Sequence, residues 1–407
     1  MIKSIELENW KSFESAILYI DPLTILIGTN AAGKSNILDA FLFLQRIASG
    51  LSIQEAIEGT TTIAPLRGGL NWVIKKPANS FCIKINFDYL EFEYNFTIKI
   101  QFEDSNTQVI EETLSIQASG KQRRLYWVAD HGDFANTIHY TTGKQGRKSF
   151  LSKPAYPVFR QLETVTDLQA DAISAIVGLT HMLCNLFILD PIPSEMRGYS
   201  PLSKSLRHDA SNIAGVLAAF SRDEKKQVEE TITEYAKTLP EKDLKRIYTE
   251  IVGAFNTDAM LMCEEGWDNA NTAIVDASGM SDGTLRYIAI VAALLTRPAN
   301  SFFIIEEVDN GLHPSRAINL LDMLRTLGTK RNIDILITTH NPAILDAAGY
   351  KMIPFVYVVH RHNKTGFSEI TSLDTLEILP KLMASGSLGD ISTSRSIEKA
   401  LHREVLP

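Results

Sequence analysis

Gly28-Thr-Asn-Ala-Ala-Gly-Lys-Ser35 decides the fold, because it matches the phosphate-binding pattern G-x-x-x-x-G-K-[ST] at every fixed position. The apolar run 23–27 before it predicts a buried strand, and residues 36–44 after it predict a helix. Strand, glycine-rich loop and helix are the context in which backbone N–H groups and a helix N-terminus bind phosphate. We therefore expect a nucleoside triphosphate here, with Lys34 on its β- and γ-phosphates and Ser35 on magnesium.

The predicted nucleotide contacts of this segment form one unbroken run. They are Gly28, Thr29, Asn30, Ala31, Ala32, Gly33, Lys34, Ser35 and Asn36. Lys34 is also a predicted catalytic residue, because its charge stabilises the phosphoryl group during transfer.

Composition narrows the class of protein. The chain has 407 residues, of which 45% are hydrophobic and 22% charged, as is typical of soluble globular proteins. Its net charge of −8 excludes a chain built as a whole to bind polyanions, so any nucleic-acid contact needs a local patch or a partner. No apolar run is long enough to span a membrane, and the N-terminus does not resemble a signal peptide. Cys82, Cys184 and Cys263 lie far apart, which favours core positions, a cytoplasmic location and no zinc site.

Two carboxylates follow a second predicted strand. The apolar run 302–305 ends in Glu306 and Glu307. A buried strand ending in acids can present carboxylate oxygens to magnesium. Glu306 is therefore the second predicted metal ligand beside Ser35, and Glu307 is the predicted catalytic carboxylate that orients or deprotonates water.

Two further motifs accompany these acids. The next predicted strand, 333–338, leads to His340, a predicted catalytic residue placed to sense the γ-phosphate. Upstream, Met280-Ser-Asp-Gly-Thr284 predicts the start of a helix, where Ser281 and Gly283 form an anion site for nucleotide.

The order of these motifs resembles the ABC-type ATPase heads of the RecF/SMC/OLD group. The resemblance covers residues 1–45 and about 270–345 and includes Glu8-Asn-Trp-Lys-Ser-Phe13, which adds Lys11 to the expected nucleotide contacts. A family-like stretch also spans 190–197 and continues at 209–214. The resemblance implies that Ser281-Asp-Gly283 completes the ATP site of a second protomer, and that Asp309–Pro314 is the D-loop at the dimer seam.

The resemblance implies an α/β P-loop head with a mixed sheet core, an antiparallel β-rich lobe, a helical insertion and no long coiled coil. The predicted segments are 1–156 (N-terminal ATPase lobe with the β-rich subdomain), 157–265 (mainly helical insertion), 266–362 (C-terminal ATPase lobe) and 363–407 (tail). Alternating apolar and polar residues over 80–142 predict the antiparallel strands. Helical periodicity predicts a helix over 243–255. The tail either closes the sheet or docks a partner.

Three features depart from the family pattern. Glu306 stands where many relatives have aspartate, and Val308-Asp309 replaces the usual Pro-Glu pair. No glutamine matches the Q-loop, for which the segment around Arg67-Gly-Gly is the candidate.

The resemblance also indicates a role. Similar small heads often belong to bacterial anti-phage operons, and OLD-type enzymes add a TOPRIM nuclease after the ATPase. Only 67 residues follow His340, and their acids form no D-x-D pair, so we expect an ATPase that is not itself a nuclease. The expected partners are a second copy or a higher oligomer and a separate nuclease or toxin effector, with no membrane. The alternatives are a RecF-like DNA-repair ATPase and, less favoured, a transporter subunit.

Basic turns of the β-rich region are the candidates for direct DNA binding. They are Lys75-Lys76, Lys121–Arg124 with Tyr126 and Trp127, and Lys144–Lys148. If these turns converge on one face they can follow a phosphate backbone; otherwise they are solvated hairpin tips.

Overall fold

The computed structural model describes residues 1–103, 106–118, 120–142, 146–239, 244–266, 272–384, 386–394 and 396–403. Lys144, residue 243 and parts of the tail therefore lie outside the described residues. The chain forms two compact units. The first unit comprises residues 1–21, 26–186 and 357–372, and the second comprises 22–25, 187–356 and 373–407. The predicted division into four consecutive segments stays a prediction.

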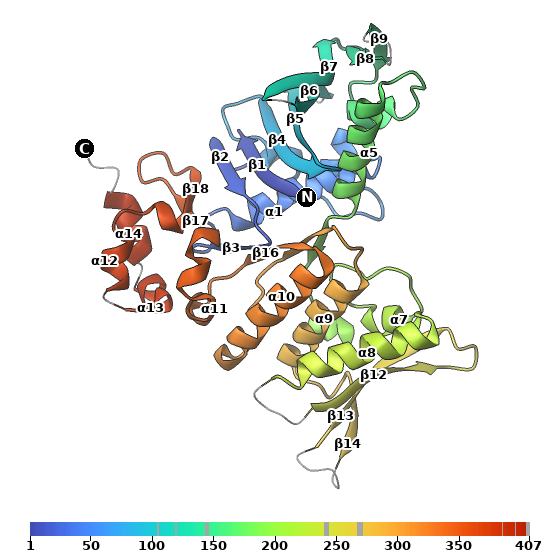
Figure 1. Ribbon diagram of the computed structural model, residues 1–407, viewed down its shortest axis with the longest axis vertical. Helices are drawn as coiled ribbons and strands as arrows, with labels where there is room; N and C mark the ends of the chain where they lie inside the picture. Colours follow the sequence, from blue (N-terminus) through green and yellow to red (C-terminus); the bar gives the residue numbers. More distant parts are fainter. Residues whose placement is uncertain are drawn as a thin grey trace. The chain divides into compact units, whose positions relative to one another are not determined.

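The first unit is built on an eight-stranded sheet with the order β2-β1-β4-β5-β6-β7-β8-β9. All neighbouring strands are antiparallel, which confirms the predicted β-rich lobe (Figure 1). The strands are β1 Ile2–Glu8, β2 Ser15–Tyr19, β4 Ser80–Tyr89, β5 Phe92–Glu103, β6 Asn106–Ala118, β7 Lys121–Asp130, β8 Asn136–Thr141 and β9 Arg147–Ser152.

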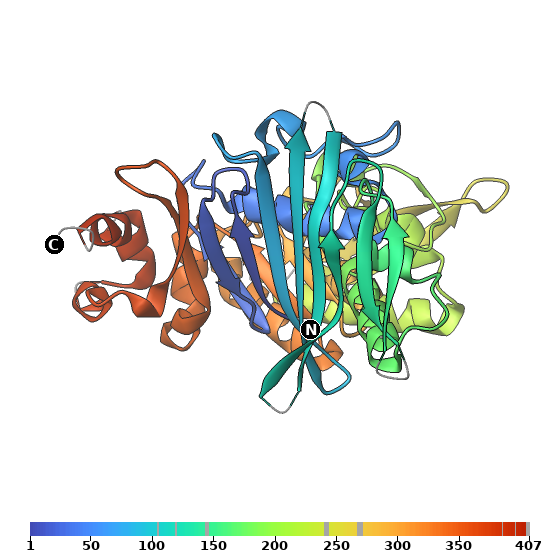
Figure 2. The same ribbon diagram turned by 90° about the horizontal axis from the view of Figure 1, so that it is seen from above.

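One face of this sheet is packed against helices. Phe81 on β4 contacts Phe43 of α1 (Lys34–Ala48), with ring centroids 5.6 Å apart. Phe96 on β5 contacts Phe159 of α4 (Val158–Leu162) at 5.6 Å, and α5 (Ala170–Cys184) contacts β7. Figure 2 shows the strands in front and these helices behind them. Because side chains alternate between the faces of a strand, the apolar residues of 80–142 fill this core and the polar residues face the other way.

The first unit also contains further strand segments and two short helices. The end of β3 (Leu23–Ile27) enters it, and β17 (Val356–Arg361) pairs antiparallel with β18 (Ser368–Ser372). Two short helices, α2 (Ile53–Glu58) and α3 (Gly69–Val73), contact each other.

Parallel strands form the centre of the second unit. β10 (Phe187–Leu189) pairs with β15 (Phe302–Ile305), and β15 pairs with β16 (Asp334–Thr338). The Ile335 N–H donates to the carbonyl of Pro22, just before β3. Parallel strands buried on both faces explain the continuous apolar runs in the sequence. The helices of this part are α9 Asp282–Thr296, α10 Ala317–Arg331 and α11 Pro342–Ala348, with 3-10 turns η1 Pro314–Arg316 and η2 Tyr350–Phe355.

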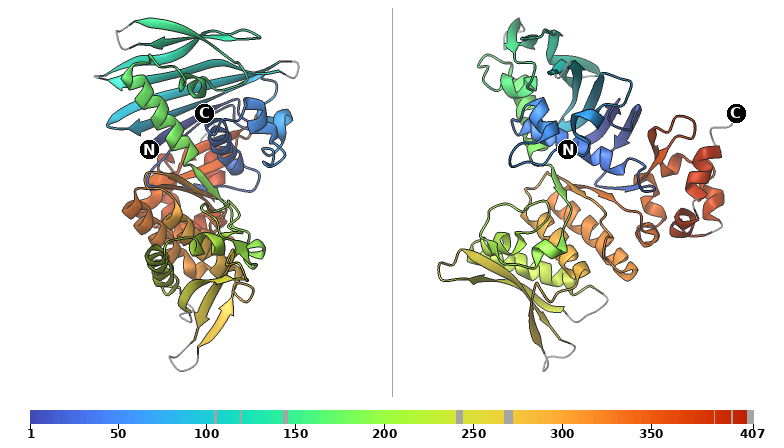
Figure 3. Two further views of the ribbon diagram at one scale, coloured as in Figure 1. Left: turned by 90° about the vertical axis from the view of Figure 1, so that its right-hand side faces the viewer. Right: turned by 180° about the vertical axis from the view of Figure 1, so that it is seen from behind.

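A smaller layer of helix on sheet completes the second unit. β11 (Ser200–Pro201), β12 (Leu244–Val252), β13 (Asp258–Glu265) and β14 (Ala273–Asp276) form an antiparallel sheet in the order β11-β13-β12, with β14 also paired to β13. Figure 3 shows α8 lying against β12, as their contacts also establish. The remaining elements are α6 Pro193–Met196, α7 Ile213–Ala218, α8 Arg222–Ala236, η3 Leu373–Thr375, α12 Leu379–Met383, α13 Leu388–Thr393 and α14 Ser396–Arg403.

The structure corrects the predicted helix over 243–255, which is wrong. Residues 244–252 form strand β12, paired with β13 over its whole length. The buried Glu229 carboxylate on α8 accepts hydrogen bonds from the N–H (2.7 Å) and hydroxyl (2.8 Å) of Thr249. This short segment carries apolar residues at helical spacing, but it is also rich in β-branched residues, which favour strands. Pairing with β13 therefore made it a strand.

Two other expectations have clear outcomes. The longest helices among the described residues have 15 residues, which confirms the expected lack of a long coiled coil. Cys82 and Cys263 are buried as expected, whereas the core position predicted for Cys184 is wrong, because this residue is exposed at the end of α5. Within the described ranges, the helices are all too short or too polar to cross a bilayer.

A buried carboxylate joins the β-rich lobe to α4. Glu112 on β6 accepts hydrogen bonds from the hydroxyl of Tyr126 (2.7 Å) and from the N–H groups of Val158 (2.7 Å) and Phe159 (2.8 Å). Burial raises the pKa of Glu112 to about 7, against the opposing effect of these three hydrogen bonds. The folded state therefore holds the proton more tightly than the unfolded chain does.

This shift predicts that the contribution of Glu112 to stability falls as pH rises from 4.5 to 7. Over that range the unfolded state releases the Glu112 proton before the folded state does. The free energy of unfolding therefore falls by about 3 kcal/mol through this group. Glu112→Gln removes this contribution, so urea unfolding of the variant at several pH values should show a smaller fall than the wild type. The exposed neighbour Glu111→Gln is the control. An unchanged slope in the Glu112 variant would contradict the assignment.

Candidate nucleotide-binding site

The predicted phosphate loop connects β3 to α1, and α1 begins at Lys34. Gly28 has φ of 144° and Gly33 has φ of 122°, a region that strongly favours glycine. A Cβ at Gly28 would lie 2.1 Å from the carbonyl oxygen of Val359, so the backbone leaves no room for a side chain. Ala31 also has a positive φ of 63°. The sequence pattern thus corresponds to a tightly turned loop at a helix N-terminus, a geometry that binds phosphate.

The side chain of Lys34 folds over its own loop. Its ammonium donates to the carbonyls of Gly28 (2.6 Å) and Thr29 (3.2 Å). Within the loop, Thr29, Asn30 and Ala31 are exposed, while Ala32 and Gly33 are buried. Lys34 and Ser35 are half-buried. The exposed part of the loop therefore keeps its backbone groups accessible to a ligand.

Residues from β17 and β18 brace the loop. Arg361 donates to the carbonyl of Ala31 through Nε (3.0 Å) and Nη2 (2.8 Å) and to Gly366 through Nη1 (3.0 Å). The Ser368 hydroxyl donates to the carbonyl of Ala32. Sequence analysis missed both residues, because they lie more than 300 positions after the loop.

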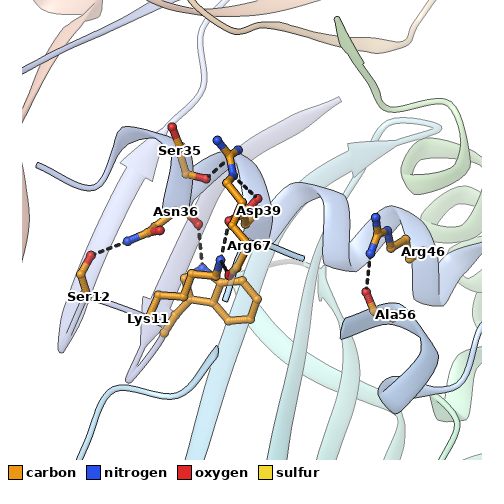
Figure 4. A network of polar contacts seen from close by, with 9 residues as sticks. Lys11, Ser12, Ser35, Asn36, Asp39, Arg46, Ala56 and Arg67 are labelled. Carbon is orange, nitrogen blue, oxygen red and sulfur yellow. Dashed lines mark hydrogen bonds and ion pairs between the residues drawn. The ribbon is translucent and has the colours of Figure 1, made fainter. Parts of the chain in front are cut away.

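The first turn of α1 is anchored by the segment before the loop (Figure 4). Asn36 donates from Nδ2 to the hydroxyl of Ser12 (2.7 Å), and Trp10 donates from Nε1 to the Asn36 carbonyl (2.7 Å). Asn36 was a predicted nucleotide contact, and the structure places it between the loop and the Trp10–Phe13 segment.

Lys11 belongs to a buried charge network on α1. Its ammonium forms an ion pair with Asp39 and donates to the carbonyl of Arg67 (2.7 Å), while Arg67 contacts Asp39 at 3.1 Å (Figure 4). Both Lys11 and Asp39 have side chains at most 5% exposed. Burial lowers the pKa of Lys11, and the charge of Asp39 partly offsets that effect. The predicted contact of Lys11 with nucleotide stays a prediction; the observed contacts show that it fixes the Arg67 segment.

A cavity of about 360 Å³ opens beside this network in the first unit. Four of its lining side chains are cations and two are aromatic. The lining residues are Lys11, Ser12, Asn36, Arg67, Trp72, Lys75, Arg361 and Phe367. Lys75 is buried, with its ammonium 3.6 Å from the ring centre of Phe367. Lys75 is therefore not the solvated DNA-binding turn that the sequence suggested. A basic cavity next to the braced loop is suited to an anionic ligand that carries a flat ring.

In the second unit, the predicted acids follow β15. The N–H of Glu306 donates to the carbonyl of Leu189 on β10 (3.1 Å). Glu307 has a positive φ of 47°, and its N–H donates to the hydroxyl of the buried Thr338 (2.8 Å). A non-glycine residue held in this conformation costs of order 1–3 kcal/mol and is found most often at functional sites. The strain at Glu307 is therefore an independent indication that its carboxylate needs a particular direction.

A third acid lies at the same edge. Asp190 directly follows β10, the parallel neighbour of β15. Its side chain keeps contact with solvent, yet local desolvation and then the charge of Glu306 raise the pKa of Asp190. Sequence analysis noted the stretch but gave Asp190 no role. An acid directly after an apolar run was the available signal.

His340 and the D-loop flank these acids. His340 follows β16 and is exposed, and the buried Thr338 and Thr339 precede it. In the D-loop, the Asn310 side chain donates to the Glu307 carboxylate at 3.4 Å, and Asp309 is buried. The catalytic role of His340 and the role of the D-loop stay predictions.

Ser281 and Gly283 begin helix α9. The exposed Ser281 accepts a hydrogen bond from the N–H of Thr284 (3.1 Å) and so forms the N-cap. Gly283 packs against the D-loop, since a Cβ there would lie 2.7 Å from the carbonyl oxygen of Gly311. The helix N-terminus and the D-loop therefore form one tightly packed edge of the second unit.

Arg197 holds the segment that leads into this helix. Its Nη1 donates to the carbonyls of Ala277 (3.1 Å) and Ser278 (2.6 Å), and its Nη2 forms an ion pair with Asp282 (2.6 Å). One guanidinium thus joins the backbone before Ser281 to the side chain of Asp282 after it. Sequence analysis quoted this arginine only as the end of a family-like stretch.

Arg197→Lys should lower kcat for ATP hydrolysis by about tenfold and leave the KM for ATP nearly unchanged. Lysine keeps the charge but cannot hold both carbonyls and the carboxylate in one plane, and such charge-assisted bonds contribute about 1.5–3 kcal/mol each. Steady-state kinetics measure the split between kcat and KM. Arg222→Lys, at the exposed start of α8, is the control. A wild-type kcat in the Arg197 variant would show that this clamp has no part in turnover.

Two family models and a solved structure are similar to this chain. Residues 1–163 match a family model described as "AAA ATPase domain", and residues 203–346 match one described as "AAA domain, putative AbiEii toxin, Type IV TA system". The fold is similar to that of an SMC head bound to the C-winged helix domain of ScpA, with a TM-score of 0.52, 16% identity, and coverage of 93% of this chain and 99% of that one. The chain has the fold of an ABC-type, SMC-like ATPase head, and AAA family models match two of its segments. The predicted fold class is confirmed.

Two relatives match most of this chain. The chain is 24% identical over 392 residues to "Retron Ec83 probable ATPase" of Escherichia coli, covering 84% of this chain and 69% of the relative. It is 22% identical over 358 residues to "ATP/GTP phosphatase" of Helicobacter pylori, covering 85% and 87%. The matched AAA segments and the names of these relatives support ATP binding and an ATPase activity for the chain.

Proposed function

We propose that this chain hydrolyses ATP to ADP and phosphate, and that nucleotide-driven pairing of two copies controls a separate effector. The observation that carries the proposal is the phosphate loop, whose backbone is fixed by Arg361 and Ser368 while its tip is exposed. A loop fixed by the protein's own contacts binds phosphate without first paying for its ordering.

The residues present fit ATP with magnesium. The strained glycines, the N-terminus of α1 and Lys34 supply donors for the triphosphate. The Ser35 hydroxyl and the Glu306 carboxylate are oxygen ligands of the kind magnesium prefers, and glutamate in place of aspartate provides the same donor atoms. Bound magnesium would neutralise phosphate charge and so lower the barrier to in-line attack.

We propose that Glu307 acts as the catalytic base for the attacking water. The contact of its N–H with Thr338 fixes its backbone, and Asn310 contacts its carboxylate. His340 then senses the γ-phosphate from the end of β16. Lys34 leaves its loop carbonyls for the phosphates and stabilises their charge during transfer.

The exposed start of α9 supports the proposed pairing. Ser281 is exposed at a helix N-terminus that the D-loop and Arg197 hold in place. We propose that this edge completes the ATP site of a second copy, so that ATP binding closes the pair and hydrolysis opens it. An isologous pair of this kind contains two equivalent ATP sites.

We propose that the effector is a separate nuclease or toxin in bacterial defence. The similarity to a retron ATPase and the family model whose description mentions a toxin support this role. A second candidate is direct binding of DNA, as in a RecF-like repair ATPase. The cations of the β-rich lobe favour DNA binding. Residues on the outer face of that lobe, described below, could make the contacts.

Co-expression with the products of neighbouring genes tests effector control. Cells carrying the candidate effector with the wild-type head, with Glu307→Gln or with Lys34→Ala should differ in growth, because the two variants hold opposite nucleotide states. We expect one state to release effector activity and the other to suppress it. Identical growth in all three strains, with each head bound to the effector, would contradict control by nucleotide.

A further inference from the structure

The outer face of the β-rich lobe carries a cluster that its core does not use. By strand register, Trp127 on β7 lies beside Thr113 on one side and His139 on the other. The same register places Arg124 beside Ser115, and Arg147 beside Thr141, on this face. We call Arg124, Trp127, His139 and Arg147 the outer platform.

The platform is a stack of flat groups. The Trp127 and His139 rings have centroids 5.5 Å apart. The guanidinium carbons of Arg124 and Arg147 lie 5.6 Å and 5.1 Å from the Trp127 ring centre. Both arginines are exposed and both rings are half-buried. Two cations and two rings therefore present flat, positively charged surface to solvent.

Neighbouring cations on the same strands serve another purpose. Arg123 forms an ion pair with Asp171 on α5, and Lys148 forms one with Asp167. These residues alternate with Arg124 and Arg147 along β7 and β9, so they point to the helix-covered face. Among the described residues, no carboxylate forms an ion pair with Arg124 or Arg147. The lobe thus neutralises its inner cations and leaves the outer pair available.

This face of the sheet is open within the first unit. The helices α1, α4 and α5 pack on the opposite face, as their aromatic contacts establish and as Figure 2 shows from the strand side. A cationic patch with stacked aromatic side chains on a protein of net charge −8 is complementary to a polyanion with exposed flat bases.

We propose that the outer platform binds single-stranded nucleic acid, with bases stacked on Trp127 and His139 and phosphates on Arg124 and Arg147. A single strand fits better than a duplex, because the base faces of a duplex are already stacked on each other. The proposal gives residues to the second candidate function above, and it does not depend on ATP hydrolysis or on an effector.

Fluorescence anisotropy of the full chain with a labelled thymidine oligonucleotide of about 20 residues tests the proposal, since such a strand exceeds the site size of typical single-strand binders. We expect tighter binding to this strand than to a duplex of equal length, with affinity falling as salt rises. Arg124→Glu with Arg147→Glu should reduce affinity at least tenfold and flatten the salt dependence. Lys226→Glu on α8 with Lys237→Glu at its C-cap makes the same charge change elsewhere and should have little effect.

Substitution of the ring separates stacking from charge. Trp127→Phe should retain most of the affinity, whereas Trp127→Leu should lose about tenfold, since stacking on an aromatic ring contributes about that factor or more per base. ATPase rates of all variants should stay at the wild-type level, which also shows that they fold.

The outcomes distinguish binding at the outer platform from direct nucleic-acid binding elsewhere on the chain. Absence of binding to any single strand or duplex rejects direct nucleic-acid binding and the platform together. Strand binding that is unchanged in Arg124→Glu/Arg147→Glu or in Trp127→Leu rejects the platform alone, as does a preference for duplex.

Discussion

Glu307→Gln is expected to lower ATP turnover by at least about a hundredfold, the usual contribution of a general base, while ATP binding persists. Glutamine has the same shape, so the N–H contact with Thr338 and the Asn310 contact remain possible, but an amide cannot take a proton from water. The ATP-bound pair should therefore accumulate. Phosphate release and solution mass with ATP measure the two effects on one sample.

The matched control for this variant is Asp322→Asn, a carboxylate on α10 away from the strand ends. It should hydrolyse ATP like the wild type and stay unpaired after turnover. If Glu307→Gln hydrolyses ATP within a few-fold of the wild-type rate, the strained conformation at this position has another cause and the catalytic base must be sought elsewhere, first at Asp190.

Ser281→Arg is expected to leave ATP binding intact and to remove the turnover that depends on pairing. Ser281 is exposed at the start of α9, whereas the phosphate loop belongs to the first unit of the chain. A long cation at the N-cap removes the hydrogen bond to Thr284 and adds bulk at the edge that we propose meets a second copy. Equilibrium binding of a fluorescent ATP analogue and steady-state hydrolysis test the two parts.

Loss of the helix cap alone could also lower turnover in Ser281→Arg, and Ser281→Ala tests this explanation. Alanine removes the cap, at about 1 kcal/mol, but adds no bulk or charge. We expect Ser281→Ala to keep much of the activity that Ser281→Arg loses. Normal hydrolysis by Ser281→Arg at any protein concentration would mean that a second copy does not use this edge.

Local motifs were the predictable part of this protein. The phosphate loop, the acids after β15 and the start of α9 each depend on a few consecutive residues, and the structure has the predicted strand, turn or helix at each place. The β-rich lobe was equally accessible, because alternation over 80–142 is long and regular. The chemistry of the three motifs was predictable because the geometry of a loop or a helix end depends on residues adjacent in sequence.

Contacts between distant segments were not predictable. Arg361 reaches Ala31 across 330 positions, and Arg197 reaches Asp282 across 85. Asp190 lies at the same edge as Glu306 only because β10 is the parallel neighbour of β15. The segment 244–252 became a strand because β13 supplied a partner, although its short apolar pattern also suits a helix. A single sequence does not specify such pairings.

The central claim is that two copies share each ATP site, and mixing two inactive variants tests it most directly. Lys34→Ala removes the lysine that we predict binds phosphate but leaves the start of α9 intact. Ser281→Arg changes the start of α9 but leaves the phosphate loop intact. In a mixed pair, one site combines the intact loop of the second variant with the intact Ser281 of the first. We expect the mixture to hydrolyse ATP at a rate well above the sum of the rates of the two separate variants. No recovery at any ratio, with mixed pairs present, would contradict it.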